Sequence, residues 1–176
     1  LTPTVVFDDV AAGWDSVGKP RLAVDAASGV IHAVWLRSGI PGATPVRDVY
    51  YARSTDDGLT WSTAQKIIDG RVDWPRVVVT GGQTHLLWNK VRSDGSAEVW
   101  QQWSSDGGER WSTATAVRGF DRLSGPATAV SGGAGGLWLG GDGASPGEIG
   151  TKVPGSRGAS RDRQPAGAGG GGTSGR

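Results

Sequence analysis

Ser54-Thr55-Asp56-Asp57-Gly58-Leu59-Thr60-Trp61 is the stretch that decides the fold, and it returns as Ser104-Ser105-Asp106-Gly107-Gly108-Glu109-Arg110-Trp111. Both octapeptides fit the pattern Ser-x-Asp-x-Gly-x-x-Trp, and both continue into Ser-Thr-Ala. They begin about 50 residues apart, a spacing that indicates an architecture of repeated units, propeller blades among them.

Each residue type in the pattern has a physical role in a reverse turn. An Asp two residues before a Gly can accept backbone N–H bonds across a tight turn, and the Gly can adopt the positive φ that such a turn needs. The Trp can then fold back and cover the base of the hairpin with a large apolar face. We therefore interpret the pattern residues as structural. They are Ser54, Asp56, Gly58, Trp61, Ser104, Asp106, Gly108 and Trp111.

Each octapeptide lies in a unit of four short predicted strands. The strands of the first unit are expected at 20–25, 30–35, 49–53 and 62–68, and those of the second at 75–79, 84–88, 98–103 and 112–118. Pro-Arg and His-x-x-Trp recur in register in both units, and no helical periodicity is present. The sequence therefore predicts an all-β fold, a partial β-propeller of four-stranded antiparallel blades with about two complete blades plus parts.

The predicted division of the chain follows from the same pattern. Residues 2–8 align with the strand after the first octapeptide, so 1–19 is expected to be the outer strand of a preceding or closing blade plus a link. The remaining parts are predicted to be blades at 20–74 and 75–124, an incomplete blade at 125–150, and a disordered, Gly-rich, low-complexity tail at 151–176. No octapeptide follows in the third unit, and we hypothesise a frameshifted or degenerate end.

The two octapeptides resemble the Asp-box, or BNR repeat, of sialidases and related β-propellers. The resemblance covers roughly residues 1 to 150. In that family the Asp-box lies on the face away from the active site, which agrees with a structural role for these residues. The resemblance implies a glycoside hydrolase or carbohydrate-binding parent that is extracellular or at the cell surface.

Composition excludes several classes of protein. The 18 Lys and Arg nearly balance the 17 Asp and Glu, so nothing predicts binding to nucleic acid or to a membrane surface. The absence of Cys excludes disulfides and thiol catalysis, and we expect neither metal nor cofactor. No apolar run approaches the roughly 20 residues of a membrane span. The chain begins Leu-Thr-Pro-Thr, without Met or signal peptide, and we expect a fragment of a longer protein.

Strand order predicts which loops share an end of the blades. The connections between second and third strands, and the links between blades, lie opposite the Asp-box turns. Propeller ligands usually bind at that end, where long loops converge. The candidates that these loops contain are Arg37, Arg47, Asp48, Asp73, Trp74, Lys90, Arg92, Asp94, Asp121 and Arg122.

Several candidates have a functional and a structural interpretation. Arg21 and Arg76 start the innermost strands and could clamp a carboxylate, but their repetition favours a structural role at strand entry. Trp74 could stack on a sugar, although packing between blades is favoured. His32 and His85 are interpreted as core residues. Arg47 and Arg92 complete the ligand-binding candidates.

A complete glycosidase site is not visible in the sequence. Sialidases use a Tyr nucleophile, an Asp acid/base and three arginines from different blades. Tyr50 and Tyr51 are the two tyrosines, and both fall in the middle of a predicted strand. The family's Arg-Ile-Pro signature is replaced by Lys19-Pro20-Arg21, and only Asp48 and Asp73 are weak acid/base candidates.

Three functions remain open from the sequence. The favoured one is a fragment of a sialidase-like propeller that acts on or binds glycans and is inactive when isolated. The alternative is a non-catalytic propeller scaffold that recognises protein or polysaccharide, as in sortilin-type receptors or photosystem assembly factors. The third is a chain that self-associates through exposed blade edges to complete a ring.

Overall fold

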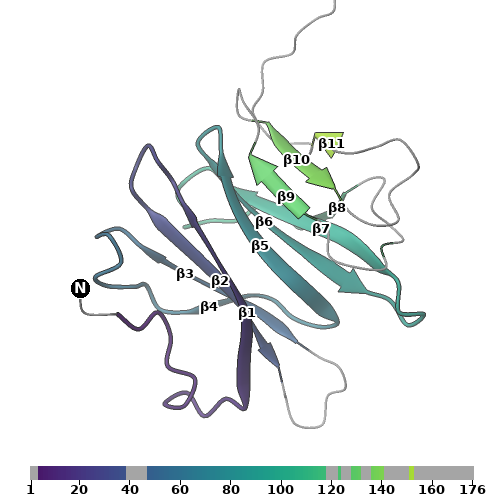
Figure 1. The fold of residues 1–176 in the computed structure, drawn as a ribbon, viewed down its shortest axis with the longest axis horizontal. Helices are drawn as coiled ribbons and strands as arrows, with labels where there is room; N and C mark the ends of the chain where they lie inside the picture. Colours follow the sequence, from purple (N-terminus) through teal and green to yellow (C-terminus); the bar gives the residue numbers. More distant parts are fainter. Residues whose placement is uncertain are drawn as a thin grey trace, which may run out of the picture.

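The described residues of this computed structural model, 4–38, 47–117, 123, 128–131, 136–140 and 151–152, form strands and turns and contain no helix. Two four-stranded antiparallel sheets and one three-stranded sheet lie side by side (Figure 1). The predicted all-β, partial-propeller fold is confirmed. The first blade consists of β1 (Ser16–Val24), β2 (Ile31–Ser38), β3 (Asp48–Ser54) and β4 (Gln65–Ile68).

The second blade repeats this meander, and a third sheet begins it again. The second blade consists of β5 (Val72–Thr80), β6 (Gln83–Val91), β7 (Ala97–Ser104) and β8 (Thr115–Ala116). The third sheet consists of β9 (Thr128–Ser131), β10 (Leu137–Gly140) and β11 (Thr151–Lys152). The first strands of the three sheets are neighbours, since β5 contacts both β1 and β9 (Figure 1).

The first strand of each complete blade begins earlier than predicted. β1 starts at Ser16 and β5 at Val72, so Asp73 and Trp74 lie in a strand and not in a linking loop. Each strand passes its proline by a break in register, between Gly18 and Arg21 in β1 and between Asp73 and Arg76 in β5. A bulge tolerates a proline because the missing N–H is not needed for the ladder there.

The N-terminal segment also differs from the expectation. Among the described residues, 4–15 contain no strand, so the outer strand expected at 2–8 is not observed. The backbone instead turns back on itself through bonds such as Gly13 N–H to Val10 O, at 3.0 Å. Phe7 and Trp14 then pack on the first blade, with ring centroids 5.4 Å apart for Phe7 and Trp35 and 4.5 Å apart for Trp14 and Tyr50. Aromatic packing therefore takes the place of strand pairing in this segment.

Hydrophobic layers separate the sheets. Ala33, Trp35 and Ala52 face the N-terminal segment, whereas the alternate residues of the same strands, such as Val34, pack against Leu86 of the second blade. Leu87 and Val99 of the second blade pack against the third sheet. Strand alternation therefore gives each blade two apolar faces, as stacked blades require.

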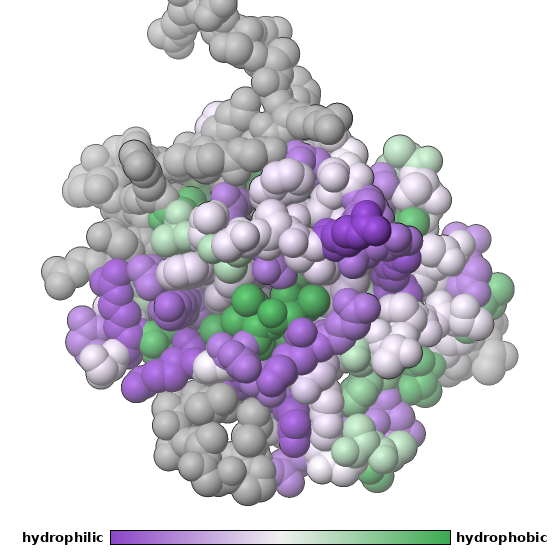
Figure 2. Space-filling model, turned by 180° about the vertical axis from the view of Figure 1, so that it is seen from behind, coloured by the Kyte–Doolittle hydropathy of each residue, from purple (hydrophilic) through white to green (hydrophobic). Residues whose placement is uncertain are grey.

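Outside these layers the surface is mixed. Seen from behind, the molecule shows a compact apolar area surrounded by polar and charged side chains (Figure 2). Within the described part of the chain, no helix is long and apolar enough to cross a membrane. Several predicted features lie outside the described residues. They are most of loop 37–48, Asp121, Arg122, much of the incomplete blade predicted at 125–150 and nearly all of the tail predicted at 151–176.

Candidate functional site

The pattern residues of 54–61 and 104–111 are engaged in their own turns. Ser54 Oγ accepts the Gly58 N–H at 2.9 Å, and Asp56 Oδ1 accepts the Thr60 N–H at 2.9 Å. A hydrogen bond from the Thr60 hydroxyl is the main reason that the pKa of Asp56 falls to about 2. The second turn repeats the arrangement, with Ser104 Oγ bonded to Gly108 N–H at 2.8 Å and Asp106 Oδ1 to Arg110 N–H at 3.0 Å.

Two strained bulges occur at equivalent places in the two blades. Lys19 and Trp74 each precede a proline, and their φ angles are 53° and 45°. Positive φ is uncommon for residues other than glycine and costs free energy, so the surrounding structure must hold it in place. Bulges beside functional sites commonly re-aim a side chain. The residues that follow the two prolines here are Arg21 and Arg76.

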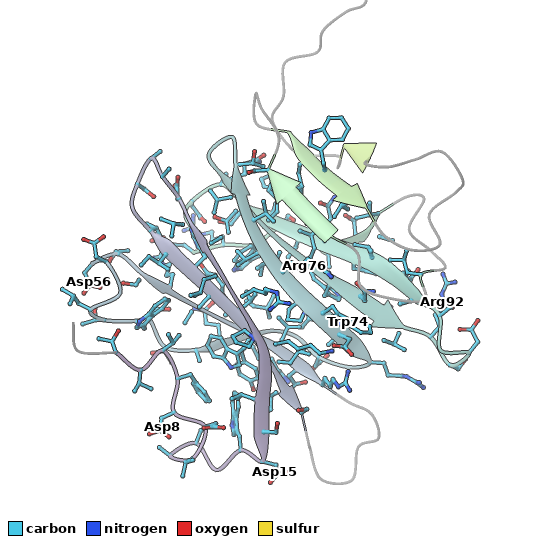
Figure 3. All side chains as sticks on the ribbon, viewed as in Figure 1. Asp8, Asp15, Asp56, Trp74, Arg76 and Arg92 are labelled. Carbon is cyan, nitrogen blue, oxygen red and sulfur yellow. The ribbon has the colours of Figure 1, made fainter. Side chains whose placement is uncertain are left out.

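Arg21 and Arg76 line one hollow of about 440 Å³ between the first strands of the sheets. We call it the Arg21–Arg76 hollow. Trp74 forms part of its wall, and Figure 3 shows Trp74 and Arg76 close together on β5. The other lining residues are apolar: Leu22, Val77, Val78 and Ala129.

The two guanidinium groups are held by backbone and not by acids. Arg21 Nη1 donates to Pro20 O and Arg76 Nη1 donates to Trp74 O, each at 2.9 Å. Burial, with a smaller contribution from the charge of Arg21, lowers the pKa of Arg76 to about 10, so it remains charged at neutral pH. Neither arginine forms an ion pair with any described residue. The hollow therefore presents positive charge to an anion, and guanidinium forks match a carboxylate.

Asp73 lies beside the hollow with its carboxylate already occupied. It is 5% exposed and forms ion pairs with Lys19 and Arg47. Its Oδ1 also accepts the Trp74 N–H at 2.7 Å. Both oxygens are engaged, so the geometry offers no support for Asp73 as an acid/base.

The other predicted candidates lie apart from the hollow. Arg92, in the β6–β7 turn, pairs with Glu98 at 3.0 Å and is distant from Arg76 in Figure 3. Asp48 is buried at the start of β3, opposite Arg37 in the strand register. Tyr50 packs against Trp14, so it belongs to the layer under the N-terminal segment. Of the ligand-binding candidates, the structure brings together Arg21, Arg76 and Trp74.

Tyr51 and the two histidines lie in the layers between sheets. Burial lowers the pKa of both His32 and His85 to about 4. His32 Nδ1 lies 2.8 Å from the Tyr51 hydroxyl, and burial raises the pKa of that tyrosine. Over the described ranges, no cluster of three or more His, Asp or Glu could hold a metal ion.

Sequence reasoning missed Lys19. Its signal was present, because Lys19-Pro20-Arg21 and Trp74-Pro75-Arg76 occupy the same place in the two repeats. Lys19 Nζ lies 4.2 Å from the centroid of the Trp74 ring, so it is a neighbour of the hollow as well as a partner of Asp73.

No family model and no curated protein matches the chain. Solved structures do resemble it. The "Hadza microbial sialidase Hz136" matches with a TM-score of 0.53 and 21% identity, over 73% of this chain and 29% of the sialidase. The GH43_1 enzyme from Xanthomonas citri complexed with xylose matches with a TM-score of 0.53 and 14% identity, over 70% of this chain and 39% of the enzyme.

The endo-arabinase from Bacteroides thetaiotaomicron has a TM-score of 0.53 and 18% identity, over 78% of this chain and 55% of the enzyme. This chain therefore spans less than two thirds of the length of each of these proteins. At such identities the likeness establishes the fold that the chain shares with these glycosidases.

Proposed function

We propose that this chain is part of a sialidase-like, Asp-box propeller that acts on or binds glycans, with blades at 20–74 and 75–124. The Arg21–Arg76 hollow binds the carboxylate of an acidic sugar. The observation that carries this proposal is the meeting of two arginines from equivalent bulges in one hollow, with no acidic partner among the described residues. The glycosidase fold of the similar structures supports it, as does the flat indole of Trp74 in the wall.

The expected chemistry is recognition of charge and shape. A hydrogen bond to a charged group contributes roughly 1.5–3 kcal/mol, so each guanidinium that contacts the carboxylate should strengthen binding about tenfold or more. The apolar face of the sugar ring would lie on Trp74. A neutral sugar would leave the two cations without a partner and bind more weakly.

Titration with sialic acid, glucuronic acid and neutral galactose, followed by NMR or calorimetry, tests this proposal. We expect the two acidic sugars to bind and galactose not to. Arg76→Ala and Arg21→Ala should each weaken binding, whereas Glu109→Gln, in the distant second Asp-box turn, should not. Equal binding of acidic and neutral sugars, or insensitivity to Arg76→Ala, would contradict the proposal.

We also propose that the isolated chain does not turn over glycosides. Both tyrosines pack in interior layers, since Tyr51 is buried and Tyr50 lies against Trp14, and neither lines the hollow. The purified chain is expected to leave a fluorogenic sialoside intact. Measurable hydrolysis would refute this point. The parent protein is proposed to be extracellular or at the cell surface, where glycans are abundant.

One observation favours the alternative of a scaffold that binds partners or copies of itself. Leu22 and Val24 of β1 are 64% and 59% exposed. Leu22 also lines an apolar hollow of about 300 Å³, together with Phe7 and Trp35 among others. A glycan array compared with a pull-down would separate glycan from protein recognition. A monomeric mass in light scattering would argue against self-association.

A further inference from the structure

An ion cluster joins the first two blades beside the Arg21–Arg76 hollow. Asp73 of β5 lies at its centre with a side chain 7% exposed. Lys19 reaches it from β1, and Arg47 reaches it from the residue before β3. We call these three residues the Asp73 cluster. All three side chains come from different strands or connections, so the cluster exists only when the two blades are packed together.

The cluster is connected to both bulges. Lys19 is the positive-φ residue of the first bulge and lies two residues before Arg21. Asp73 lies immediately before Trp74, the positive-φ residue of the second bulge, and accepts its N–H at 2.7 Å. The carbonyl of Trp74 in turn accepts the Arg76 guanidinium at 2.9 Å. A continuous path therefore runs from Lys19 through Asp73 and Trp74 to Arg76.

The two repeats differ at the position of this carboxylate. Gly18 occupies in the first blade the place that Asp73 occupies in the second. Lys19 consequently has no carboxylate at that place in its own strand and extends to the next blade instead. Its ammonium also lies over the Trp74 ring, 4.2 Å from the centroid. One buried carboxylate thus ties the two bulges to each other across the blade junction.

We propose that Asp73 is the positioning residue of the Arg21–Arg76 hollow. By pairing with Lys19 and holding Trp74, it sets the separation of the two guanidinium groups and the orientation of the indole. This inference rests on the proposed function, because it assumes that the hollow binds the carboxylate of an acidic sugar and names the residue that shapes the hollow for it. Asp73 acts through Arg76 and Trp74 and does not itself contact the ligand. Its carboxylate faces Lys19, Arg47 and the Trp74 N–H from the elements packed around it.

The test uses Asp73→Asn, which keeps the size of the side chain and an oxygen for the Trp74 N–H but removes the charge. We expect the affinity for sialic acid to fall about tenfold, because a neutral amide holds Lys19 and the Trp74 N–H less firmly and the two guanidinium groups then lose their fixed separation. Glu109→Gln is the matched control, because it removes a different ion pair between the same two blades, Arg53–Glu109. Its affinity should equal that of the unaltered chain.

A spectroscopic measurement separates positioning from a general effect on folding. In chain labelled with 5-fluorotryptophan, the Trp74 resonance is identified by its loss in Trp74→Phe. Asp73→Asn and Lys19→Met should both shift this resonance, because the first weakens the hydrogen bond that holds the Trp74 N–H and the second removes the ammonium over the indole ring. Glu109→Gln should not. If Asp73→Asn does not fold, the test uses Lys19→Met, which leaves the Arg47–Asp73 pair in place. Its affinity for sialic acid and its Trp74 resonance then decide the question.

The outcomes distinguish this inference from the proposed function. Failure of the unaltered chain to bind sialic acid overturns the proposed function, and the Trp74 resonance then still decides whether Asp73 positions the indole. Binding that is unaffected by Asp73→Asn, with an unshifted Trp74 resonance, overturns the inference alone. A lower unfolding temperature with unchanged affinity and resonance also overturns it, because the cluster would then serve stability only.

Discussion

The turns at 54–61 and 104–111 share the hydrogen bonds that their Ser and Asp side chains accept from the turn backbone, but their surroundings differ. The first turn meets the N-terminal segment, where Thr4 Oγ1 donates to Gly58 O at 2.5 Å. The second is clamped by the first blade, because Arg53 Nη1 donates to Gly107 O at 2.9 Å. The Tyr51 ring also lies edge-on to Trp111, with centroids 5.1 Å apart. The repeated pattern therefore builds the turn, and the neighbouring blade decides whether the turn also fastens one sheet to the next.

The buried histidines show the same contrast. His32 faces the second blade and bonds to the Tyr51 hydroxyl at 2.8 Å, with Thr84 Oγ1 3.4 Å from its other ring nitrogen. His85 holds the equivalent place facing the third sheet, and neither of its ring nitrogens has a partner among the described residues. The ring of His32 is thus held by specific polar contacts at the first junction, whereas the ring of His85 at the next junction has only packing contacts among the described residues.

The largest difference in stability between the two turns is expected when their glycines, Gly58 and Gly108, are replaced by alanine. Both Gly58 and Gly108 have positive φ, so alanine should cost roughly 1–2 kcal/mol at either. A Cβ on Gly108 would lie 1.9 Å from the Tyr51 hydroxyl, against 3.7 Å from Ile31 Cδ1 for Gly58. Overpacking adds roughly 1–3 kcal/mol, so Gly108→Ala should lose roughly 2–5 kcal/mol in urea unfolding.

Tyr51→Phe supplies the control for that difference, since it removes the nearest clashing atom. In the Tyr51→Phe background, Gly108→Ala should cost less than it does alone. Equal costs for Gly58→Ala and Gly108→Ala would show that the two turns have equivalent surroundings after all.

Acid should weaken both junctions through the histidines. Because burial lowers each pKa from 6.5 to about 4, the unfolded chain binds protons that the folded chain does not, and stability falls as the pH drops from 6.5 towards 4. Each histidine should contribute a loss of roughly 2–3 kcal/mol over that interval. Urea unfolding at pH 7 and pH 4.5 measures the loss, and His85→Leu should reduce it. Stability independent of pH in this range would contradict the burial of both rings.

At neutral pH the two histidines should differ in how much their replacement changes the free energy of unfolding. His32→Leu leaves the buried Tyr51 hydroxyl without its close partner and should cost roughly 1–3 kcal/mol. His85→Leu removes two ring nitrogens that have no described partner and should be close to neutral or stabilising. Thermal unfolding of the two variants at pH 7.5 gives the comparison. A greater cost for His85→Leu would reverse our interpretation of the two junctions.

The smallest effect is expected at the outer part of the clamp on the second turn. Arg53 Nη2 and Glu109 Oε1 are 2.8 Å apart, but the Glu109 side chain is 59% exposed. Exposed ion pairs contribute roughly 0–1 kcal/mol, so Glu109→Gln should change the unfolding free energy by less than about 1 kcal/mol. Raising the salt concentration should reduce even this difference. A loss of unfolding free energy larger than about 1 kcal/mol would show that the Arg53–Glu109 ion pair, and not Tyr51, holds the second turn.

Much of the fold could be predicted because the relevant signals are local. The turn residues of 54–61 and 104–111 act within a few positions of one another, and alternation of apolar residues reports the two buried faces of a strand such as β2. The strands through Pro20 and Pro75 were missed at their beginnings, because proline normally ends a strand and the bulges that accommodate it have no separate local signature.

The candidate site depended on contacts that no local signal reports. Sequence order placed Asp73 and Trp74 at the correct junction but in a loop, and it grouped them with Arg92, which the structure separates from the hollow. Pairing of Lys19 with Asp73 joins residues 54 positions apart. Such pairs arise only when two sheets pack in one particular orientation.

The sequence alone determined that this chain folds into repeated four-stranded antiparallel sheets with Asp-held turns, because turn geometry and strand alternation arise from neighbouring residues. Tertiary structure alone decided that Arg21 and Arg76 share a hollow, that Asp73 lies between two cations, and that the first blade clamps the turn at 104–111. These outcomes depend on the packing of one blade against the next, where side chains distant in sequence meet and exclude water.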